Sequence, residues 1–277
     1  MMDEKQKKRL LWQLPFLTLL IVGTVLIIRQ QQKMPYQKYS DFVFGTTFTV
    51  TYQCDSDMSQ SIKAELMKVD HSLSPFNKVS IISAINNNQD VKPDKMFMDV
   101  FEQAMKVSRE TDGAFDITVA PLVNAWGFGF KNDEMPTKRQ VDSLRQIIGY
   151  QKISLADGKI RKQDPRMMLD CSAIAKGYGT DVVATLLRRS GVKNFMVEIG
   201  GEIVTCGVNP ERLPWKVGVI KPDDDSLSVS HELQTVLNVT DIAMATSGNY
   251  RKFYYKGGKK YAHTIDPKTG RPVQHNI

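Results

Sequence analysis

The chain has 277 residues, enough for one large domain or two small ones with a substantial core. Its formal net charge of +7 is modest, and no long basic run occurs after the first residues, so charge does not indicate nucleic-acid binding. The charge is compatible with an anionic small substrate or an anionic membrane surface. The three cysteines are too scattered for a zinc site, and we interpret them as small buried residues, with a single disulfide left open: Cys54, Cys171 and Cys206.

The N-terminal segment differs in composition from the rest of the chain. A basic tail over 1–9 precedes an apolar run over 10–28, which is about as long as a membrane-spanning helix requires. We predict a transmembrane signal anchor here, uncleaved because no small-x-small site follows, and then a polar linker over 29–40. A buried core helix is the alternative. Because positive charge is denser before the run, we expect the remaining domain on the periplasmic side of the inner membrane.

The next part of the chain predicts one strand, three helices and a hairpin. Residues 42–53 alternate in polarity and predict a strand with a bend at Gly45. Helical spacing of apolar residues, with the usual start and stop signals, predicts helices over 59–73, 93–111 and 137–149. A turn at Asp157–Gly158 predicts a β-hairpin.

The stretch 169–181 reads as a strand end, a tight turn and a helix start. Asp170 lies on the turn and Lys176 in the first turns of the helix. Such a junction directs backbone N–H groups at anionic ligands, and a carboxylate beside it would suit a metal ion bound to that anion. A plain helix cap is an equally good interpretation of Asp170 from this stretch alone.

Paired glycines, Gly200 and Gly201, interrupt a strand over 195–204 and predict a bulge or a close approach of a ligand to the backbone. The acidic run 223–225 is interpreted as a solvated turn rather than a metal site. Strands outnumber helices and several join as hairpins, so we expect an α+β fold with mainly antiparallel pairing. Neither a Gly-x-Gly-x-x-Gly pattern after a strand nor a Walker loop occurs, which argues against both common nucleotide folds.

Six separated stretches then form a series: 113–118, 121–129, 169–181, 198–202, 246–250 and 263–270. In identity, order and approximate spacing they resemble the motifs of the ApbE family, the FAD:protein FMN transferases. The resemblance implies a single ApbE-like, T-fold-like domain over 41–277, with an antiparallel sheet and packed helices. It also implies Mg²⁺-dependent transfer of FMN from FAD to a Thr or Ser hydroxyl of a flavoprotein, with release of AMP. Acceptors in the family are subunits of membrane redox complexes.

Two other activities stay open at this point. One is a Mg²⁺-dependent FAD pyrophosphatase that forms FMN and AMP, and the other is a membrane-tethered flavin-binding protein without turnover. The family continues into a further strand that supplies the remaining metal ligands, whereas this sequence ends at Ile277, so we expect a fragment.

The resemblance assigns roles to individual residues. Ala173 would offer its backbone carbonyl to Mg²⁺, although Ser172-Ala173 replaces the family's Gly-Gly. His263 is the candidate base for the acceptor hydroxyl, because its ordinary pKa lies close to working pH. A structural strand histidine is the alternative. FAD contacts are expected from Phe44, Phe76, Ala114, Phe115, Asp116, Asp170, Lys176 and, through its backbone, Ile265.

Overall fold

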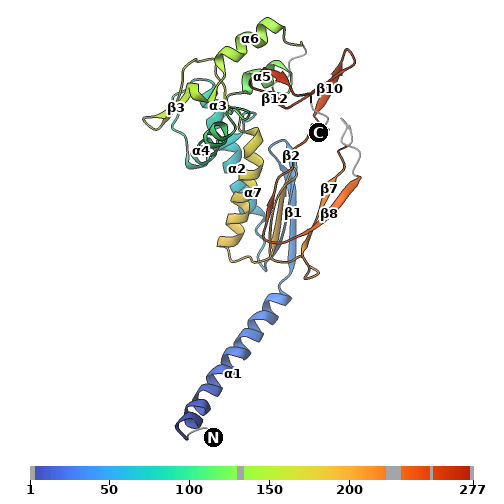
Figure 1. Cartoon of the computed structure of the whole chain (residues 1–277). Helices are drawn as coiled ribbons and strands as arrows, with labels where there is room; N and C mark the ends of the chain where they lie inside the picture. The colour runs from blue at the N-terminus through green and yellow to red at the C-terminus, as the bar shows by residue number, and fades with distance from the viewer. Residues whose placement is uncertain (1–3, 130–133, 223–231, 250–251, 275–277) are drawn as a thin grey trace.

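A five-stranded antiparallel sheet is the centre of the fold in the computed structural model, which describes residues 4–129, 134–222, 232–249 and 252–274 (Figure 1). Neighbouring strands pair antiparallel throughout this sheet. In spatial order its strands are β1 (Tyr36–Val43), β2 (Thr46–Gln53), β5 (Phe195–Ile199), β6 (Glu202–Cys206) and β9 (Ala243–Met244). The predicted α+β fold with antiparallel pairing is confirmed.

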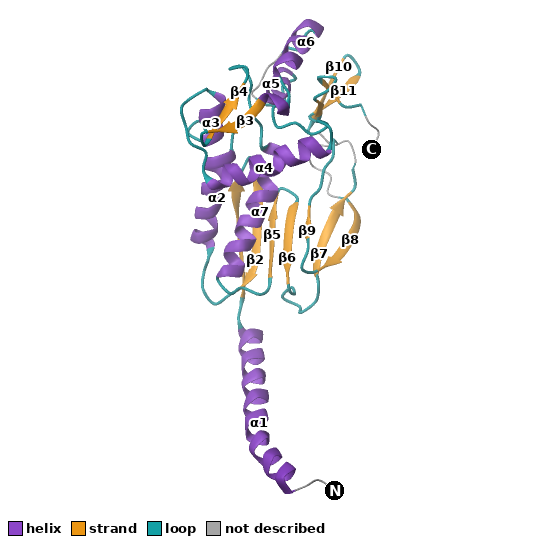
Figure 2. Ribbon diagram, turned by 60° about the vertical axis from the view of Figure 1, so that its left-hand side comes forward, coloured by secondary structure: helices purple, strands orange, loops and turns teal. Residues whose placement is uncertain are grey.

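Two helices, α2 (Ser59–Leu73) and α7 (Ser172–Arg189), cover one face of the sheet (Figure 2). The strands alternate buried and more exposed residues, so one side of each strand packs under the helices. Burial of each large aliphatic side chain contributes roughly 1.5–3 kcal/mol. This core includes Phe48, Val50, Ile62, Leu66, Val183, Leu187 and Val197.

A second core lies beyond the upper ends of α2 and α7. It joins these helices to α3 (Ile81–Asn86), α4 (Lys95–Glu110) and the hairpin of β3 (Ile153–Ala156) and β4 (Lys159–Lys162). The predicted turn at Asp157–Gly158 is confirmed, with φ of 53° and 69°. The helix predicted over 137–149 is α6 (Lys138–Ile147), which begins with a complete capping box in which the hydroxyl of Thr137 accepts from the backbone N–H of Gln140.

A third, smaller core contains Leu122, Trp126, Val141, Ile148 and Ile265. It gathers α5 (Ala120–Ala125), α6 and the short pair β12 (Ile265–Asp266) and β13 (Arg271–Pro272). Two further hairpins complete the fold: β7 (Trp215–Ile220) with β8 (Leu233–Val239), and β10 (Phe253–Lys256) with β11 (Lys259–Ala262).

Three expectations need correction. The strand over 42–53 is the second half of a hairpin, because the chain turns at Phe44–Gly45, where both residues have positive φ of 52° and 74°. The helix α3 was not predicted, since a six-residue helix is too short to show a helical repeat. The paired glycines form the tight turn between β5 and β6 rather than a bulge within one strand.

The N-terminal helix α1 (Glu4–Lys33) projects away from the sheet (Figure 1). A search of the described residues finds no helix long and apolar enough to cross a bilayer, so the predicted transmembrane anchor is not supported. Most of the expected linker over 29–40 belongs to α1 and to β1, which begins at Tyr36. The acidic run 223–225 lies outside the described residues. Cys171 is buried, Cys54 and Cys206 are half-buried, and all three thiols are unpaired.

Candidate functional site

Asp170 lies directly before α7. The N-cap position of this helix is held by Cys171, without a side-chain capping bond, so Asp170 is not the helix cap. Its carboxylate oxygen Oδ1 instead accepts the backbone N–H of Ser172, two residues on, at 2.7 Å. The backbone N–H of Asp170 donates to the carbonyl of Ile117 at 2.8 Å and ties this turn to the 113–118 motif. Among the described residues no donor reaches the other carboxylate oxygen, so that oxygen can bind a ligand.

Lys176 points from α7 to the glycine turn between β5 and β6. Its ammonium nitrogen Nζ donates to Glu202 Oε1 at 3.1 Å and to the carbonyl of Gly200 at 3.3 Å. Gly200 and Gly201 have φ of 55° and 95°, a region that glycine adopts at little cost. The turn therefore holds the ammonium group of Lys176, while its own backbone N–H groups are bonded within the protein, Gly200 to the carbonyl of Thr47 and Gly201 to Glu198 Oε1.

Neighbouring segments close in tightly on this glycine turn. A Cβ at position 200 would lie 2.7 Å from Thr46 Cγ2 and 3.3 Å from Lys176 Cδ. A Cβ at position 201 would lie 2.9 Å from the hydroxyl of Thr246. Four of the segments that the sequence singled out therefore converge: the β1–β2 turn, the start of α7, the glycine turn and the 246–250 motif.

Phe44 connects this site to the packing of α7. Its ring lies against Gly179, where an added Cβ would be 2.8 Å from Phe44 Cε2. The same ring contacts both of the larger cores. Phe44 is thus placed beside α7, one turn from Lys176, where the family resemblance expects an FAD contact.

The tripeptide 114–116 has a structural role in its last residue. Asp116 is buried, and its carboxylate accepts from the backbone N–H and hydroxyl of Thr118, at 2.8 and 2.6 Å, and from the backbone N–H of Tyr150 at 2.8 Å. With three internal donors, this carboxylate holds the loop together rather than presenting itself to a ligand. Ala114 is exposed and Phe115 is half-buried against the second core.

Two further expected contacts lie apart from the glycine turn in the packing of the molecule. Phe76 follows α2 and its side chain is 63% exposed. Ile265 is buried in the third core with Trp126, whose indole N–H donates to the carbonyl of Gly270 at 2.8 Å. The side chain of Ile265 is therefore used in packing, and the expected contact of its backbone with FAD stays a prediction.

His263 follows β11 and is half-buried beside the Phe128 ring, with 6.5 Å between ring centroids. Its ring nitrogen Nδ1 lies 3.3 Å from the carbonyl oxygen of Lys252. Burial lowers the pKa of His263 below its ordinary value of 6.5, and the positive charges of Lys252 and Lys176 lower it further. The lowered pKa keeps its imidazole neutral at neutral pH.

The donors available to a metal ion are few. No group of three or more His, Cys, Asp or Glu side chains in the described ranges could hold one. Asp170 offers a carboxylate oxygen, and Ala173 is exposed in the first turn of α7. A Cβ at Gly177, one turn after Ala173, would meet no atom within 4 Å, so no side chain covers this part of the helix. These donors fit Mg²⁺, which usually takes one or two carboxylates and completes its shell with substrate phosphates and water.

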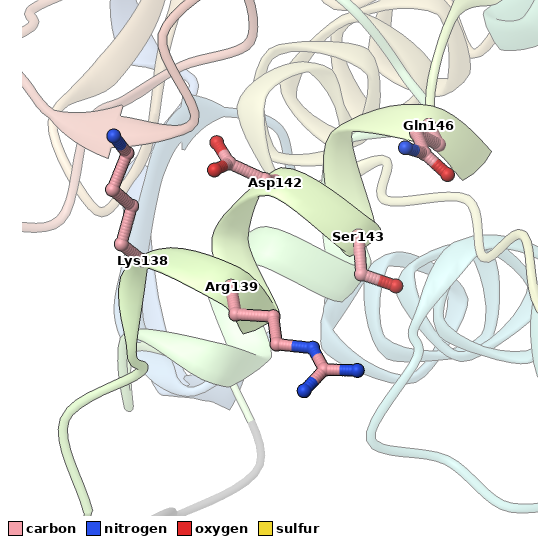
Figure 3. Close-up of a pocket in the computed structure, with 5 residues that line it drawn as sticks. All are labelled: Lys138, Arg139, Asp142, Ser143 and Gln146. Carbon is pink, nitrogen blue, oxygen red and sulfur yellow. The ribbon is translucent and has the colours of Figure 1, made fainter.

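Surface hollows do not mark the site. A hollow of about 640 Å³ is lined by residues of α6 alone, and Figure 3 shows these side chains spread along the helix rather than converging: Lys138, Arg139, Asp142, Ser143 and Gln146 (Figure 3). A second, of about 460 Å³, lies between α2 and the start of α4. Neither contains an expected site residue, so the candidate site rests on the convergence of its segments.

Sequence reasoning missed Glu202 as the partner of Lys176, and Thr46 and Thr246 as neighbours of the glycine turn. A glutamate directly after paired glycines was the available signal for Glu202. Its pairing with a lysine 26 residues earlier depends on the register of β5 and β6 against α7.

Comparison with known proteins identifies the family. The model of the ApbE family matches residues 44–277. The FAD:protein FMN transferase of Vibrio cholerae is 35% identical over 271 residues, 94% of this chain and 80% of that protein, and the Haemophilus influenzae protein of the same name is 36% identical over 250 residues, 84% and 71% of the two chains. The solved structure of the flavin transferase ApbE from Vibrio cholerae matches with a TM-score of 0.75 at 35% identity, over 87% of this chain and 79% of that one. The chain therefore belongs to the ApbE family.

Proposed function

We propose that this chain transfers FMN from FAD to a Thr or Ser hydroxyl of a flavoprotein and releases AMP. The observation that carries the proposal is the convergence of Lys176, from α7, with the Gly200–Gly201 turn and the 246–250 motif. A cation near the N-terminus of a helix suits a pyrophosphate, and the half-buried, neutral imidazole of His263 suits a proton acceptor. The names of the relatives support the same reaction.

The binding half of the reaction falls to Lys176, Asp170 and the start of α7. Phosphoryl transfer depends mainly on positioning and on charge stabilisation, so a fixed lysine and aligned backbone N–H groups are the chief requirements. Phe44, packed on Gly179, would support the bound flavin nucleotide from the side of the β1–β2 turn.

The chemical half falls to His263. In the tautomer that donates from Nδ1 to the carbonyl of Lys252, Nε2 keeps its lone pair and can accept a proton. The acceptor hydroxyl loses its proton to Nε2, its oxygen bonds to the phosphorus of the FMN half, and the bond from that phosphorus to the bridging oxygen breaks. The bridging oxygen leaves with AMP.

Magnesium is part of this proposal. Asp170 and the carbonyl of Ala173 would hold the ion, and it would neutralise charge that develops on the phosphates. Replacing Asp170 by Asn should weaken FAD binding in the presence of Mg²⁺, measured by titration. An unchanged affinity would refute this placement.

The acceptor and the location are proposed in the same way. We propose that the acceptors are flavoprotein subunits of membrane redox complexes and that the domain works outside the cytoplasm. Digestion of the domain by added protease in spheroplasts but not in intact cells would support the extracytoplasmic location, and protection in both would refute it.

One assay separates transfer from the other two activities. The chain is incubated with FAD, Mg²⁺ and a purified acceptor subunit, and the products are resolved by denaturing gel and by chromatography. Flavin fluorescence on the acceptor band, with one AMP per flavin, supports transfer. FMN and AMP in solution with an unlabelled acceptor would identify a pyrophosphatase, and bound but intact FAD would identify a flavin-binding protein.

A further inference from the structure

The hairpin β10–β11 and the residues that follow it are unusually basic and aromatic. Between Lys252 and Ile265 the sequence has four lysines and four large aromatic residues, and no Asp or Glu. The hairpin projects from the end of the domain opposite α1 (Figure 1). The proposed roles in FAD binding and proton transfer do not use the side chains of Lys256, Lys259 or Lys260.

The inner face of the hairpin is anchored to the third core. Tyr254 and Tyr261 stack on each other at 5.4 Å between centroids, and each also stacks on an aromatic ring of the 121–129 motif, Phe128 and Trp126 respectively. The hydroxyl of Tyr254 donates to the carbonyl of Trp126 at 3.0 Å. It also contacts the sulfur of Met135, so the segment that carries Glu134 adjoins this inner side. The hairpin is therefore a fixed projection.

The outer face carries the opposite set of side chains, because residues alternate along a strand. Phe253 and Tyr255 meet edge to face at 5.6 Å, and the ammonium of Lys260 lies 4.4 Å from the centroid of the Phe253 ring. Tyr255 is 61% exposed. By the same alternation Lys256 and Lys259, which pair with each other, belong to the side of Tyr254 and Tyr261. Both are nevertheless exposed at the tip, next to the Gly257–Gly258 turn, so the tip extends the outer face.

This surface adjoins the candidate base. His263 follows β11 directly, and its backbone N–H donates to the carbonyl of Lys252, which precedes β10, at 3.0 Å. A polypeptide on the hairpin would therefore lie within a few residues of the imidazole that receives the proton.

We propose that the outer face and tip of β10–β11 dock an acidic segment of the acceptor flavoprotein, the segment that flanks its target hydroxyl. This inference rests on the proposed transferase function. Lysines without intervening carboxylates complement acidic side chains, and rigid exposed aromatic residues provide contact area at low entropic cost. The docking surface consists of Phe253, Tyr255, Lys256, Lys259 and Lys260.

The test is the double substitution Lys256→Glu with Lys259→Glu, assayed with a purified acceptor domain over a range of concentrations. We expect KM for the acceptor to rise by about tenfold or more at low salt, with kcat within about twofold, because charges at the rim of an interface act mainly on association. Salt should raise the KM of the unaltered chain toward that of the variant. Tyr255→Ser should raise the acceptor KM by a factor that is the same at low and at high salt, because it removes no charge.

The matched control, Lys38→Glu with Lys193→Glu, reverses the charge of two exposed lysines at the opposite end of the domain. It should leave the KM for the acceptor unchanged. FAD affinity should equal that of the unaltered chain in every variant. An unchanged acceptor KM in the hairpin variant would overturn the docking surface while leaving the transferase function intact. Weaker FAD binding would instead make the hairpin a nucleotide contact, and loss of binding to anionic vesicles with unchanged transfer would make it a membrane contact. Failure of the unaltered chain to label any acceptor would refute the transferase function itself.

Discussion

Two glycines of α7, only two residues apart, should respond oppositely to alanine. Gly177 faces open space, since an added Cβ would meet no atom within 4 Å, whereas at Gly179 it would lie 2.8 Å from Phe44 Cε2 and 3.3 Å from Cζ. In a helix interior alanine is favoured over glycine by about 1 kcal/mol. Gly177→Ala should therefore raise the free energy of unfolding by about 1 kcal/mol, which corresponds to about 2–4 °C in Tm for a protein of this size.

Gly179→Ala gains the same propensity but overpacks the contact with Phe44, at a cost of about 1–3 kcal/mol. The two variants should therefore differ in unfolding free energy by about 1–3 kcal/mol, with Gly177→Ala the more stable. Urea unfolding followed by tryptophan fluorescence measures the difference. Adding Phe44→Leu to Gly179→Ala should recover part of the loss, because the smaller side chain vacates the contact. Equal stability of the two variants would refute the packing of Phe44 against α7.

The variant Gly177→Ala also distinguishes an effect on stability from an effect on FAD binding. A methyl group at position 177 lies over the open side of the first turns of α7, where the phosphates and Mg²⁺ are proposed to bind. We therefore expect Gly177→Ala to weaken FAD binding although it stabilises the protein. If stability and FAD affinity rise together, the phosphates do not bind over this part of the helix.

Four further predictions concern three side chains. His263→Ala should slow transfer by about 10²–10⁴-fold with FAD affinity preserved, and wild-type single-turnover rates would exclude it as the base. The acidic limb of the pH–rate profile should lie below pH 6.5, because burial and the charges of Lys252 and Lys176 lower the pKa of His263. In Lys176→Met the acidic limb should move to higher pH at saturating FAD, because a positive charge that disfavours the imidazolium is removed. An acidic limb at unchanged pH would show that Lys176 does not lower the pKa of His263. Asp116→Asn should lower the free energy of unfolding by about 2–3 kcal/mol, because the amide cannot accept hydrogen bonds from both Thr118 and Tyr150. An unchanged urea midpoint would show that the carboxylate of Asp116 does not stabilise this loop.

Local signals predicted much of the fold. The helical repeats over 59–73 and 137–149 both correspond to helices in the structure, because each depends on residues one or two turns apart. The hairpin turn at Phe44–Gly45 was missed as a turn because a phenylalanine with positive φ carries no turn signal in sequence.

The site was less accessible to local reasoning, because its geometry depends on long-range pairing. Asp170 and Lys176 could be placed on a helix start from their own stretch alone. The ion pair of Lys176 with Glu202, and the saturation of Asp116 by Thr118 and Tyr150, require the register of separate segments. The family resemblance named the expected FAD contacts. It could not show that the carboxylate of Asp116 already accepts hydrogen bonds from Thr118 and Tyr150.

The ion pair between Lys176 and Glu202 has a consequence for ligand discrimination. In the resting protein the lysine is neutralised by a carboxylate only 13% exposed, so the glycine turn presents little net positive charge to passing anions. An incoming phosphate has to compete with Glu202 for the ammonium group. A ligand that brings its own divalent cation and two linked phosphates can meet that competition, whereas inorganic phosphate alone is at a disadvantage. Under the proposed function, Glu202 would therefore favour FAD with its Mg²⁺ over inorganic phosphate at this turn.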